Sequence, residues 1–277
     1  FPTTEQLPIN GHLDLLKGVY NRIVKDFNKN QPLSFKLSTY VDAPAGSGLG
    51  SSSTLTVAIL GAFCEWLKLP LGEYDIAKLA YDIERNDLGY AGGKQDQYAA
   101  TFGGFNFMEF YENDKVIVNP LRIKDKFISE LEHDLVLYYT KTSRVSAEII
   151  EAQSQNVKDK KSSSIDAMHH LKEQALMMKE ALLIGNIEDI GRILDFGWQF
   201  KKKMAAGISN TEIDTIYETA LKSGATGGKI SGAGGGGFML CFAPINKRYD
   251  VIKALDKLGG QTMPYRFVKH GLKTWKI

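Results

Sequence analysis

The sequence predicts a two-domain α+β protein, and three observations support this fold class. The chain has 277 residues, of which 43% are hydrophobic, so it exceeds the usual size of one domain and can form two cores. Helical stripes and strand-like runs follow one another along both halves. A charged stretch ends just before the apolar run Leu135–Tyr139. We therefore predict one domain at residues 1–130 and a second at 131–277.

The first half of the chain reads as a strand followed mostly by helices. Residues 35–40 alternate between apolar and polar side chains, as a half-buried strand does. Helices are predicted at Thr54–Leu69, which carries an apolar stripe, and at Leu71–Arg85. Strand-like runs at 105–110 and 116–118 are separated by polar turn residues and predict a paired hairpin.

The second half begins with the predicted buried strand Leu135–Tyr139. Residues 153–164 are polar and rich in lysine, which predicts a loop. Ser162–Ser164 would then cap a long helix that ends at Gly185-Asn186. Further helices and a strand pair at Phe238–Phe242 and Tyr265–Val268 would complete an α+β domain.

A loop rich in glycine and serine runs into the apolar helix predicted at Thr54–Leu69. Glycines let backbone N–H groups approach an anion, and serines can cap a helix whose positive end then faces that anion. The alternative is a flexible linker, but a linker need not lie between a strand and an amphipathic helix. No Gly-Lys-Ser/Thr closes the loop, so it is not a Walker motif. The predicted cradle for nucleotide phosphates comprises Pro44, Gly46, Ser47, Gly48, Leu49, Gly50, Ser51, Ser52 and Ser53.

A second glycine-rich segment, Lys229–Gly237, precedes the strand predicted at Phe238–Phe242. Five of the six residues from 232 to 237 are glycine, and they give up backbone entropy that a turn would not require. A close backbone approach to a ligand or to the first loop explains this better than a plain turn. The candidate residues here are Ser231, Gly232, Gly234, Gly235 and Gly236.

The two loops together resemble the GHMP kinase superfamily. Its second motif, Pro-x-x-x-Gly-Leu-Gly-Ser-Ser, matches Pro44 and Gly48–Ser52, and its glycine-rich third motif matches Lys229–Gly237. The resemblance covers essentially the whole chain. It implies an ATP-dependent small-molecule kinase that uses Mg²⁺, with an N-terminal ribosomal-protein S5 domain 2-like domain that binds ATP and a ferredoxin-like C-terminal domain.

The same resemblance assigns roles to two carboxylates. An aspartate in a similar Gly-x-x-Asp-Gln segment is the general base in sugar-phosphorylating members, which implies this role for Asp96. A glutamate at a comparable distance upstream holds magnesium with a serine of the second motif, which implies Glu84 and Ser52 as metal ligands. A carboxylate and a hydroxyl suit Mg²⁺, and phosphoryl transfer requires positioning and charge neutralisation. Taken singly, Glu84 could instead be a solvated charge and Asp96 a helix cap.

One part of the family pattern has no match in this sequence. The family's first motif carries a basic residue that pairs with the catalytic aspartate, and nothing before Pro44 corresponds to it. We expect the first strands of the N-terminal domain to be missing from this sequence. Lys94, two residues before Asp96, is the candidate for a replacement positive charge.

The substrate class follows from a narrower resemblance. Gly92–Gln97 and the segment from Gly271 to Ile277 look like the D-glycero-D-manno-heptose 7-phosphate kinase branch, which implies a phosphorylated sugar phosphorylated at its anomeric hydroxyl. Arg144 is a weak candidate for an anionic substrate group. Lys201–Lys203 read as a solvated helix face, or alternatively as a counter-charge for the substrate phosphate. The alternatives are fucokinase-like or galactokinase-like enzymes, a mevalonate-type kinase, and an inactive nucleotide sensor.

Charge and composition exclude other classes. A net charge of +2 gives no field that would attract nucleic acid, and no apolar run approaches the roughly eighteen residues of a membrane span. Cys64 and Cys241 lie in apolar segments and read as reduced, buried thiols. We therefore expect a cytoplasmic enzyme, and the sequence does not indicate its oligomeric state.

Overall fold

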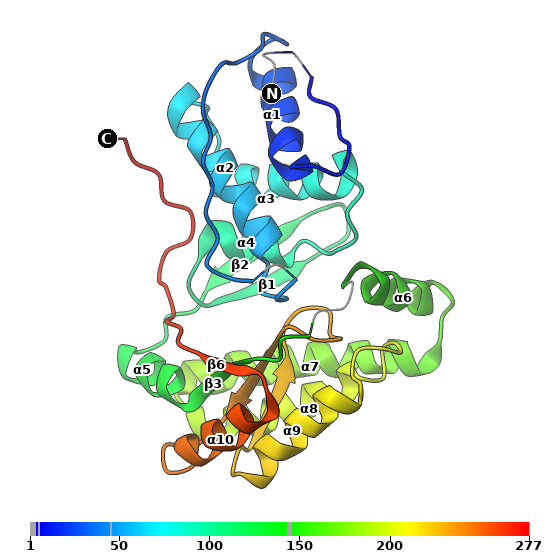
Figure 1. Ribbon diagram of the computed structural model, residues 1–277, viewed down its shortest axis with the longest axis vertical. Coiled ribbons are helices and arrows are strands. Elements are labelled where there is room, and N and C mark those ends of the chain that lie inside the picture. Colours follow the sequence, from blue (N-terminus) through cyan, green and yellow to red (C-terminus); the bar gives the residue numbers. More distant parts are fainter. Residues whose placement is uncertain (1–3, 5, 45, 143–145, 277) are drawn as a thin grey trace. The chain divides into compact units, whose positions relative to one another are not determined.

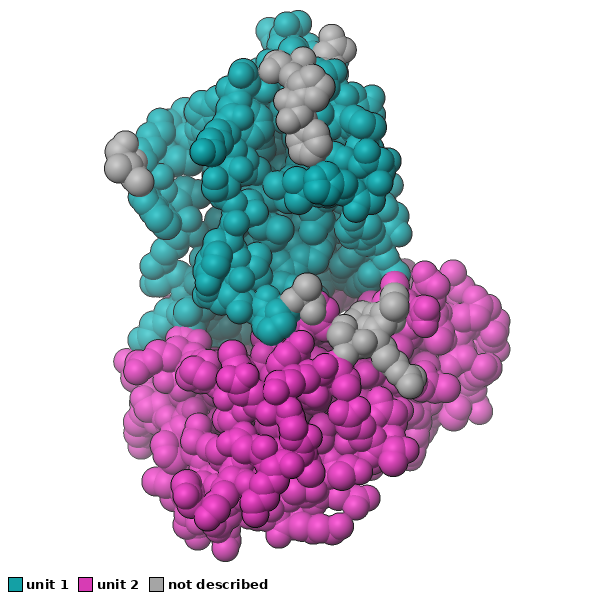
Figure 2. Space-filling model, viewed as in Figure 1, with its two compact units in different colours: residues 1–44, 50–108, 268–277 teal, residues 45–49, 109–267 magenta. Residues whose placement is uncertain are grey.

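Two hydrophobic cores organise the chain in the computed structural model, which describes residues 4, 6–44, 46–142 and 146–276. The chain divides accordingly into two compact units (Figure 2). Unit 1 comprises Phe1–Pro44, Gly50–Met108 and Val268–Ile277, and unit 2 comprises Ala45–Leu49 and Glu109–Phe267. The domain boundary between residues 130 and 131 stays a prediction, because compactness and domain ancestry need not divide a chain at the same residue.

Unit 1 is built from helices around one apolar core. The core gathers side chains from the helices and the connecting loops, among them Val19, Ile23, Leu60, Phe63 and Ile83. Its elements are α1 (Asp14–Phe27), α2 (Ser51–Leu67), α3 (Glu73–Asp82), a π-helix (Ile83–Asp87) and α4 (Gln95–Phe102) (Figure 1). The two helices predicted from the sequence are thus present, and the second changes to π geometry where the sequence predicts continued α-helix.

The strand predicted at residues 35–40 is absent from the described chain. The segment is irregular, since no described strand provides a hydrogen-bonding ladder for it. Instead, the backbone N–H of Leu33 donates to the Tyr20 hydroxyl, and Phe35 packs edge-on against Phe63. Only Leu37 of residues 35–40 is partly buried and the other five residues are exposed, so the alternating pattern does not bury one face of this segment.

The end of the chain returns to unit 1. The backbone N–H of Leu272 donates to Thr101 O at 3.0 Å, and the Leu272 side chain packs against the unit 1 core. A Cβ at Gly61 of α2 would approach Leu272 Cδ1 at 2.5 Å, so this glycine makes room for the returning segment. Leu272 is therefore part of this core, while residues 273–276 are exposed.

A hairpin follows α4. Strands β1 (Asn106–Phe110) and β2 (Val116–Pro120) form a two-stranded sheet, which confirms the predicted pair. Asn113 and Asp114 between them have φ values of 61° and 60°, a left-handed conformation that these two residue types tolerate well.

Unit 2 contains a four-stranded antiparallel sheet in the order β4-β5-β3-β6. Its strands are β3 (Leu135–Tyr139), β4 (Gly227–Ile230), β5 (Phe238–Phe242) and β6 (Gln261–Met263). In register, Val136 faces Cys241 and Leu137 faces Met263. Six helices accompany the sheet within the described residues (Figure 1): α5 (Asp125–Asp134), α6 (Ser146–Lys158), α7 (Ser162–Ile184), α8 (Ile190–Lys201), α9 (Thr211–Lys222) and α10 (Arg248–Leu255).

Three predictions for the second half are wrong. Most of the predicted loop 153–164 is helical, because α6 extends to Lys158 and its Asn156 donates to Met204 O. Ser162–Ser164 form the first turn of α7 and do not cap it, since Lys161 is the N-cap residue and it makes no side-chain capping hydrogen bond. Residues 265–268 are not a strand, because Tyr265 and Phe267 bond to Glu132 and Leu135 instead.

The two cysteines are free thiols, with Cys241 buried and Cys64 partly buried. Burial raises the pKa of the Cys241 thiol to about 12. Within the described residues, no helix combines the length and apolar character that crossing a membrane requires.

Candidate active site

The glycine–serine loop is divided between the two units at Leu49-Gly50. Its glycines Gly46, Gly48 and Gly50 have φ values of 72°, 74° and 71°, which L side chains adopt only with strain. Residues 46–49 belong to unit 2 and residues 50–53 to unit 1. Each half is therefore described with its own unit.

In unit 2, the loop contacts the second glycine-rich segment directly. Ser231 Oγ donates to Gly48 O at 3.0 Å, and the backbone N–H of Phe238 donates to Ser47 O at 3.2 Å. A Cβ at Gly48 would approach Ser231 O at 2.8 Å, so only glycine fits there. The close approach predicted from the glycine content is thus confirmed as contact between the two loops. Ser47 Oγ is buried without a hydrogen-bond partner.

In unit 1, the serines of the loop form the first turn of α2. The N-cap residue is Gly50, and no side chain caps the helix, so the predicted capping role is wrong. Ser52 Oγ donates to Glu84 Oε1 at 2.6 Å and Ser53 Oγ to Glu84 Oε2 at 2.7 Å. The hydroxyls face a carboxylate, while the first N–H groups of a helix are the ones left without an intrahelical partner.

Glu84 is fully buried and is held on three sides by polar groups. Besides Ser52 and Ser53, the side-chain amide Nε2 of Gln97 donates to Glu84 Oε2. No described side chain forms an ion pair with Glu84, and Gln97 Oε1 is buried without a hydrogen-bond partner. A buried negative charge surrounded by oxygen donors and lacking a counter-charge fits a hard cation.

The donor set also limits what kind of metal could bind. No group of three or more His, Cys, Asp or Glu side chains suited to a metal ion occurs among the described residues. A cation at Glu84 and Ser52 would therefore take its other ligands from phosphate oxygens and water, which is how Mg²⁺ binds in nucleotide sites.

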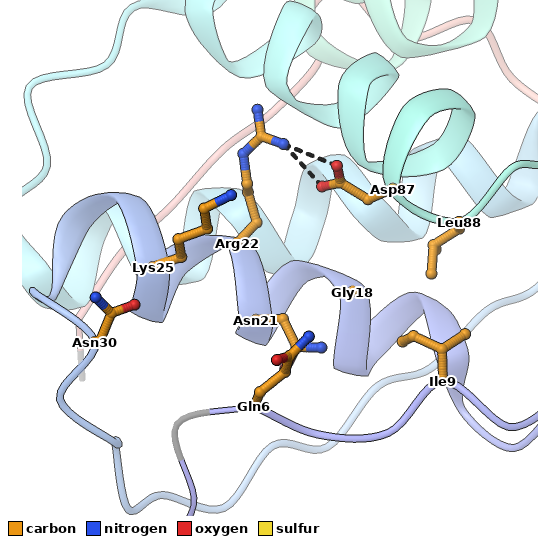
Figure 3. A pocket seen from close by; sticks show the side chains of 9 residues that line it. All are labelled: Gln6, Ile9, Gly18, Asn21, Arg22, Lys25, Asn30, Asp87 and Leu88. Atoms are coloured by element: carbon orange, nitrogen blue, oxygen red, sulfur yellow. Dashed lines mark hydrogen bonds and ion pairs between the residues drawn. The ribbon is translucent and has the colours of Figure 1, made fainter.

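Glu84 lies in the π-helix, and an ion pair anchors the last residue of this helix, Asp87. Leu88 N–H donates to Ile83 O, a bond that spans five residues, and Tyr90 N–H donates to Glu84 O. Such π turns are frequent at functional sites. At the last residue of the turn, Arg22 Nη1 of α1 contacts both oxygens of Asp87 at 2.9 Å (Figure 3).

The Arg22–Asp87 pair lies at a cavity of about 440 Å³ in unit 1 (Figure 3). Its lining comprises Gln6, Ile9, Gly18, Asn21, Arg22, Lys25, Asn30, Asp87 and Leu88. None of the residues predicted for the active site lines it.

Asp96 lies in the first turn of α4 beside the loop. A Cβ at Gly50 would approach Asp96 Cγ at 3.2 Å, so the loop passes close to this carboxylate. Burial raises the pKa of Asp96 above its usual value, the charge of Glu84 raises it further, and the charge of Arg85 lowers it. The structure thus brings Ser52, Glu84 and Asp96 together in unit 1.

Arg85 is a site residue that the sequence reading missed. Its guanidinium is held by the backbone carbonyls of Gly93 and Tyr90, both at 3.4 Å. A Cβ at Gly92 would approach Arg85 Nη2 at 2.5 Å, so glycine lets the side chain lie against the backbone. Arg85 therefore supplies positive charge near Asp96, the role that the sequence reading gave to Lys94.

The remaining candidates have other surroundings. Lys94 is the N-cap residue of α4 and its Nζ lies 5.1 Å from the Tyr81 ring centroid. Arg144 lies outside the described residues. Lys201 is partly buried and donates to Gln153 Oε1 at 2.8 Å, so the prediction of a solvated face is wrong for this lysine. Lys203 is exposed.

Comparison with known proteins identifies the family. The profile of the GHMP kinases N terminal domain matches residues 14–104, and that of the GHMP kinases C terminal domain matches residues 178–263. The chain is 53% identical over 277 residues to a D-glycero-alpha-D-manno-heptose 7-phosphate kinase of Campylobacter jejuni, covering all of this chain and 81% of that protein. The chain belongs to the GHMP kinase family. This confirms the resemblance, the two-domain α+β fold and the prediction of a phosphotransferase that uses ATP and an alcohol acceptor.

Solved GHMP kinase structures agree with this assignment. A D-glycero-D-manno-heptose 1-phosphate kinase from Bacteroides thetaiotaomicron matches with a TM-score of 0.82 and 46% identity, over 100% of this chain and 79% of that one. A Lactococcus lactis galactokinase complexed with galactose matches with a TM-score of 0.69 and 17% identity, over 94% of this chain and 76% of that one, and this likeness concerns the fold alone.

Proposed function

We propose that this GHMP kinase transfers a phosphoryl group from ATP to the anomeric hydroxyl of D-glycero-D-manno-heptose 7-phosphate. The product would be the 1,7-bisphosphate, a precursor for nucleotide-activated heptose and surface glycans. The observation that carries the proposal is the 53% identity over the whole chain to a heptose 7-phosphate kinase. Because ATP and sugar phosphates are metabolites of the cytoplasm, we also propose a cytoplasmic location.

Asp96 is the proposed general base. The attacking hydroxyl loses its proton during phosphoryl transfer from ATP, and a carboxylate beside it can accept that proton. Burial raises the pKa of Asp96, and the nearby guanidinium of Arg85 opposes this shift and so favours the ionised carboxylate. Arg85 thus tunes the base without accepting the proton itself.

The proposed nucleotide site is the glycine–serine loop. Gly46, Gly48 and Gly50 have positive φ values and no Cβ, which lets an anion approach the backbone N–H groups of the loop. The N-terminus of α2 carries partial positive charge. Contact with Ser231 supports the unit 2 half of this loop in its conformation. We therefore place the phosphates of ATP at residues 46–53.

Glu84 and Ser52 are the proposed holders of Mg²⁺. When bound there, Mg²⁺ would neutralise charge on the phosphate oxygens during transfer. Glu84→Gln removes the charge and keeps the shape, so it should raise the Mg²⁺ concentration that gives half-maximal activity. Glu112→Gln, at an exposed position in unit 2, is the matched control and should leave the Mg²⁺ requirement unchanged.

The two heptose kinases above differ in where their names place the existing phosphate, at carbon 7 in one and at carbon 1 in the other. A substrate panel decides between them. Heptose 7-phosphate, heptose 1-phosphate and free sugars are each supplied with ATP, and the products are analysed by phosphorus NMR. We expect turnover of the 7-phosphate and a new acid-labile phosphate that couples to the C1 proton.

Other results of this panel would redirect the assignment. Turnover of heptose 1-phosphate with a new signal from a primary phosphate would place the reaction at the other end of the sugar. Equal rates with free fucose would favour a fucokinase-like enzyme, a class that includes a 28% identical bifunctional relative from Arabidopsis thaliana. ATP binding without transfer to any sugar would indicate a nucleotide sensor.

A further inference from the structure

Two lysines of unit 2 come together between α8 and the sheet. Lys201 is the last residue of α8, and Lys229 lies in β4. A Cβ at Gly227 would overlap Gly191 O of α8, so this face of β4 is turned toward α8. Side chains two residues apart on a strand share a face, which places the Lys229 side chain on the α8 side as well.

Neither ammonium group has a carboxylate partner among the described residues. Lys201 Nζ donates to Gln153 Oε1 at 2.8 Å, which is a neutral acceptor. The only acidic residue of α8 is Asp195, and its Oδ1 accepts from the Tyr217 hydroxyl at 2.5 Å and from Gln199 Nε2 at 2.7 Å. The lysine pair therefore has no counter-charge among the described residues.

The surroundings make the charge of the two lysines costly. Burial and the neighbouring charge of Lys229 lower the pKa of Lys201 to about 8, and burial lowers the pKa of Lys229. Two like charges removed from water and left without an anion destabilise a folded domain. A dianionic group bound between the two ammonium groups would offset both their repulsion and their desolvation. No described side chain of the protein supplies such an anion.

The same residues are connected to the glycine-rich segment. Gln153 of α6, which accepts from Lys201, donates through Nε2 to Ala233 O at 3.4 Å. Lys229 stands two residues before Ser231, whose hydroxyl holds Gly48 O. The lysine pair is therefore built into the segment that supports the unit 2 half of the glycine–serine loop.

We propose that Lys201 and Lys229 form a phosphate-binding subsite of unit 2. Its ligand is a phosphate monoester dianion, which ammonium groups bind through charge-assisted hydrogen bonds. We assign it to the phosphate already present on the sugar, and this assignment rests on the proposed function. The alternative source is a phosphate of the nucleotide.

The test compares Lys201→Met and Lys229→Met with the parent enzyme, with Lys222→Met as control. Lys222 ends α9, is exposed and pairs with Glu218, so its loss should change no kinetic constant by more than twofold. In either subsite variant, KM for heptose 7-phosphate should rise about 10- to 100-fold, as expected for one lost charge-assisted bond. KM for ATP should stay within twofold, and Lys229→Arg should restore most of the sugar affinity.

Three outcomes of these measurements would overturn the proposal or part of it. A rise in KM for ATP alone would assign the subsite to the nucleotide and overturn the sugar assignment. Unchanged constants for both substrates would overturn the subsite. If the parent does not turn over heptose 7-phosphate, the proposed function fails, and calorimetry with inorganic phosphate still tests the subsite, because binding should be lost in Lys201→Met and kept in Lys222→Met. Equal binding in both variants would overturn it.

A melting experiment excludes a purely structural role for the pair. Because the variants remove an unpaired buried charge, we expect each to melt at or above the temperature of the parent in the absence of ligand. Lower melting temperatures in both variants, together with failed rescue by Lys229→Arg, would indicate that the lysines support the fold and would overturn the subsite.

Discussion

The two serines that contact Glu84 should have separable effects when each is replaced by alanine. Ser53 is 2% exposed and donates to Glu84 Oε2 while its Oγ accepts from Gln97. In Ser53→Ala, no water can replace the lost hydroxyl beside a fully buried carboxylate. Ser52 is exposed and donates to Oε1, so in Ser52→Ala water can take its place. The first change should therefore cost stability and the second should not.

The magnitude follows from the kind of bond removed. A hydrogen bond to a charged group contributes about 1.5–3 kcal/mol, and about 1 kcal/mol corresponds to 2–4 °C in Tm for a chain of this size class. We expect Ser53→Ala to lower Tm by about 3–12 °C. Because water replaces the exposed Ser52 hydroxyl, Ser52→Ala should lower Tm by less than about 2 °C.

The effect of the two variants on the Mg²⁺ requirement should have the opposite order to their effect on Tm. Ser52 is the proposed Mg²⁺ partner of Glu84, so Ser52→Ala should raise the Mg²⁺ concentration for half-maximal activity more than Ser53→Ala does. Circular dichroism melts and Mg²⁺ titrations on the same preparations provide both values. If Ser52→Ala melts as low as Ser53→Ala, or if the two variants share one Mg²⁺ requirement, the division of roles between the hydroxyls is wrong.

Three further predictions concern the base and the loop. Asp96→Asn should lower turnover by about 10²–10⁴-fold with ATP affinity nearly unchanged; near-normal turnover would mean that the hydroxyl loses its proton by another route. The variant should not lower Tm at neutral pH. The pKa of Asp96 is raised on folding, so the ionised carboxylate lowers the stability of the folded protein as pH rises above the unfolded-state pKa. Arg85→Gln removes a charge that lowers the pKa of Asp96, so the acidic limb of the kcat/KM profile should move to higher pH, while Arg192→Gln, whose side chain is 76% exposed, should not move it. At Gly48, φ is 74° and a side chain would overlap Ser231 O, so Gly48→Val should weaken ATP binding at least tenfold by calorimetry. Gly11→Val is the control, because Gly11 has a similar φ of 86° with open space around it. Equal ATP affinity in the two glycine variants would refute the cradle.

Local patterns predicted the elements whose partners lie nearby. The helix at α2, the hairpin of β1 and β2, and the strand β3 follow from periodicity. Residues 35–40 and 265–268 have the same alternation and form no strand, because strand pairing depends on a partner that periodicity does not reveal. The polar composition of residues 153–158 concealed the end of α6, which is held by a side-chain contact to Met204 O.

Site residues that belong to a recognised motif could be predicted from the sequence. Site residues that the fold alone brings together could not. Ser52, Glu84 and Asp96 were found through the resemblance, and the structure brings them together in unit 1. Arg85 was missed because no motif names it, and its guanidinium is held by the backbone carbonyls of Tyr90 and Gly93, contacts that only the fold reveals. Ser53 and Gln97 lie beside recognised residues, so a search for further polar side chains around Glu84 would have found them.

The path of the chain through the two units has a consequence for synthesis on the ribosome. Unit 2 is complete once residue 267 has emerged, but unit 1 includes the segment from residue 268 onward, where Leu272 joins the core and bonds to Thr101. The core of unit 1 is therefore incomplete until residue 272 has emerged. Since Glu84 and Asp96 belong to unit 1, these carboxylates would stay in an unfinished fold until after all strands of the unit 2 sheet have emerged.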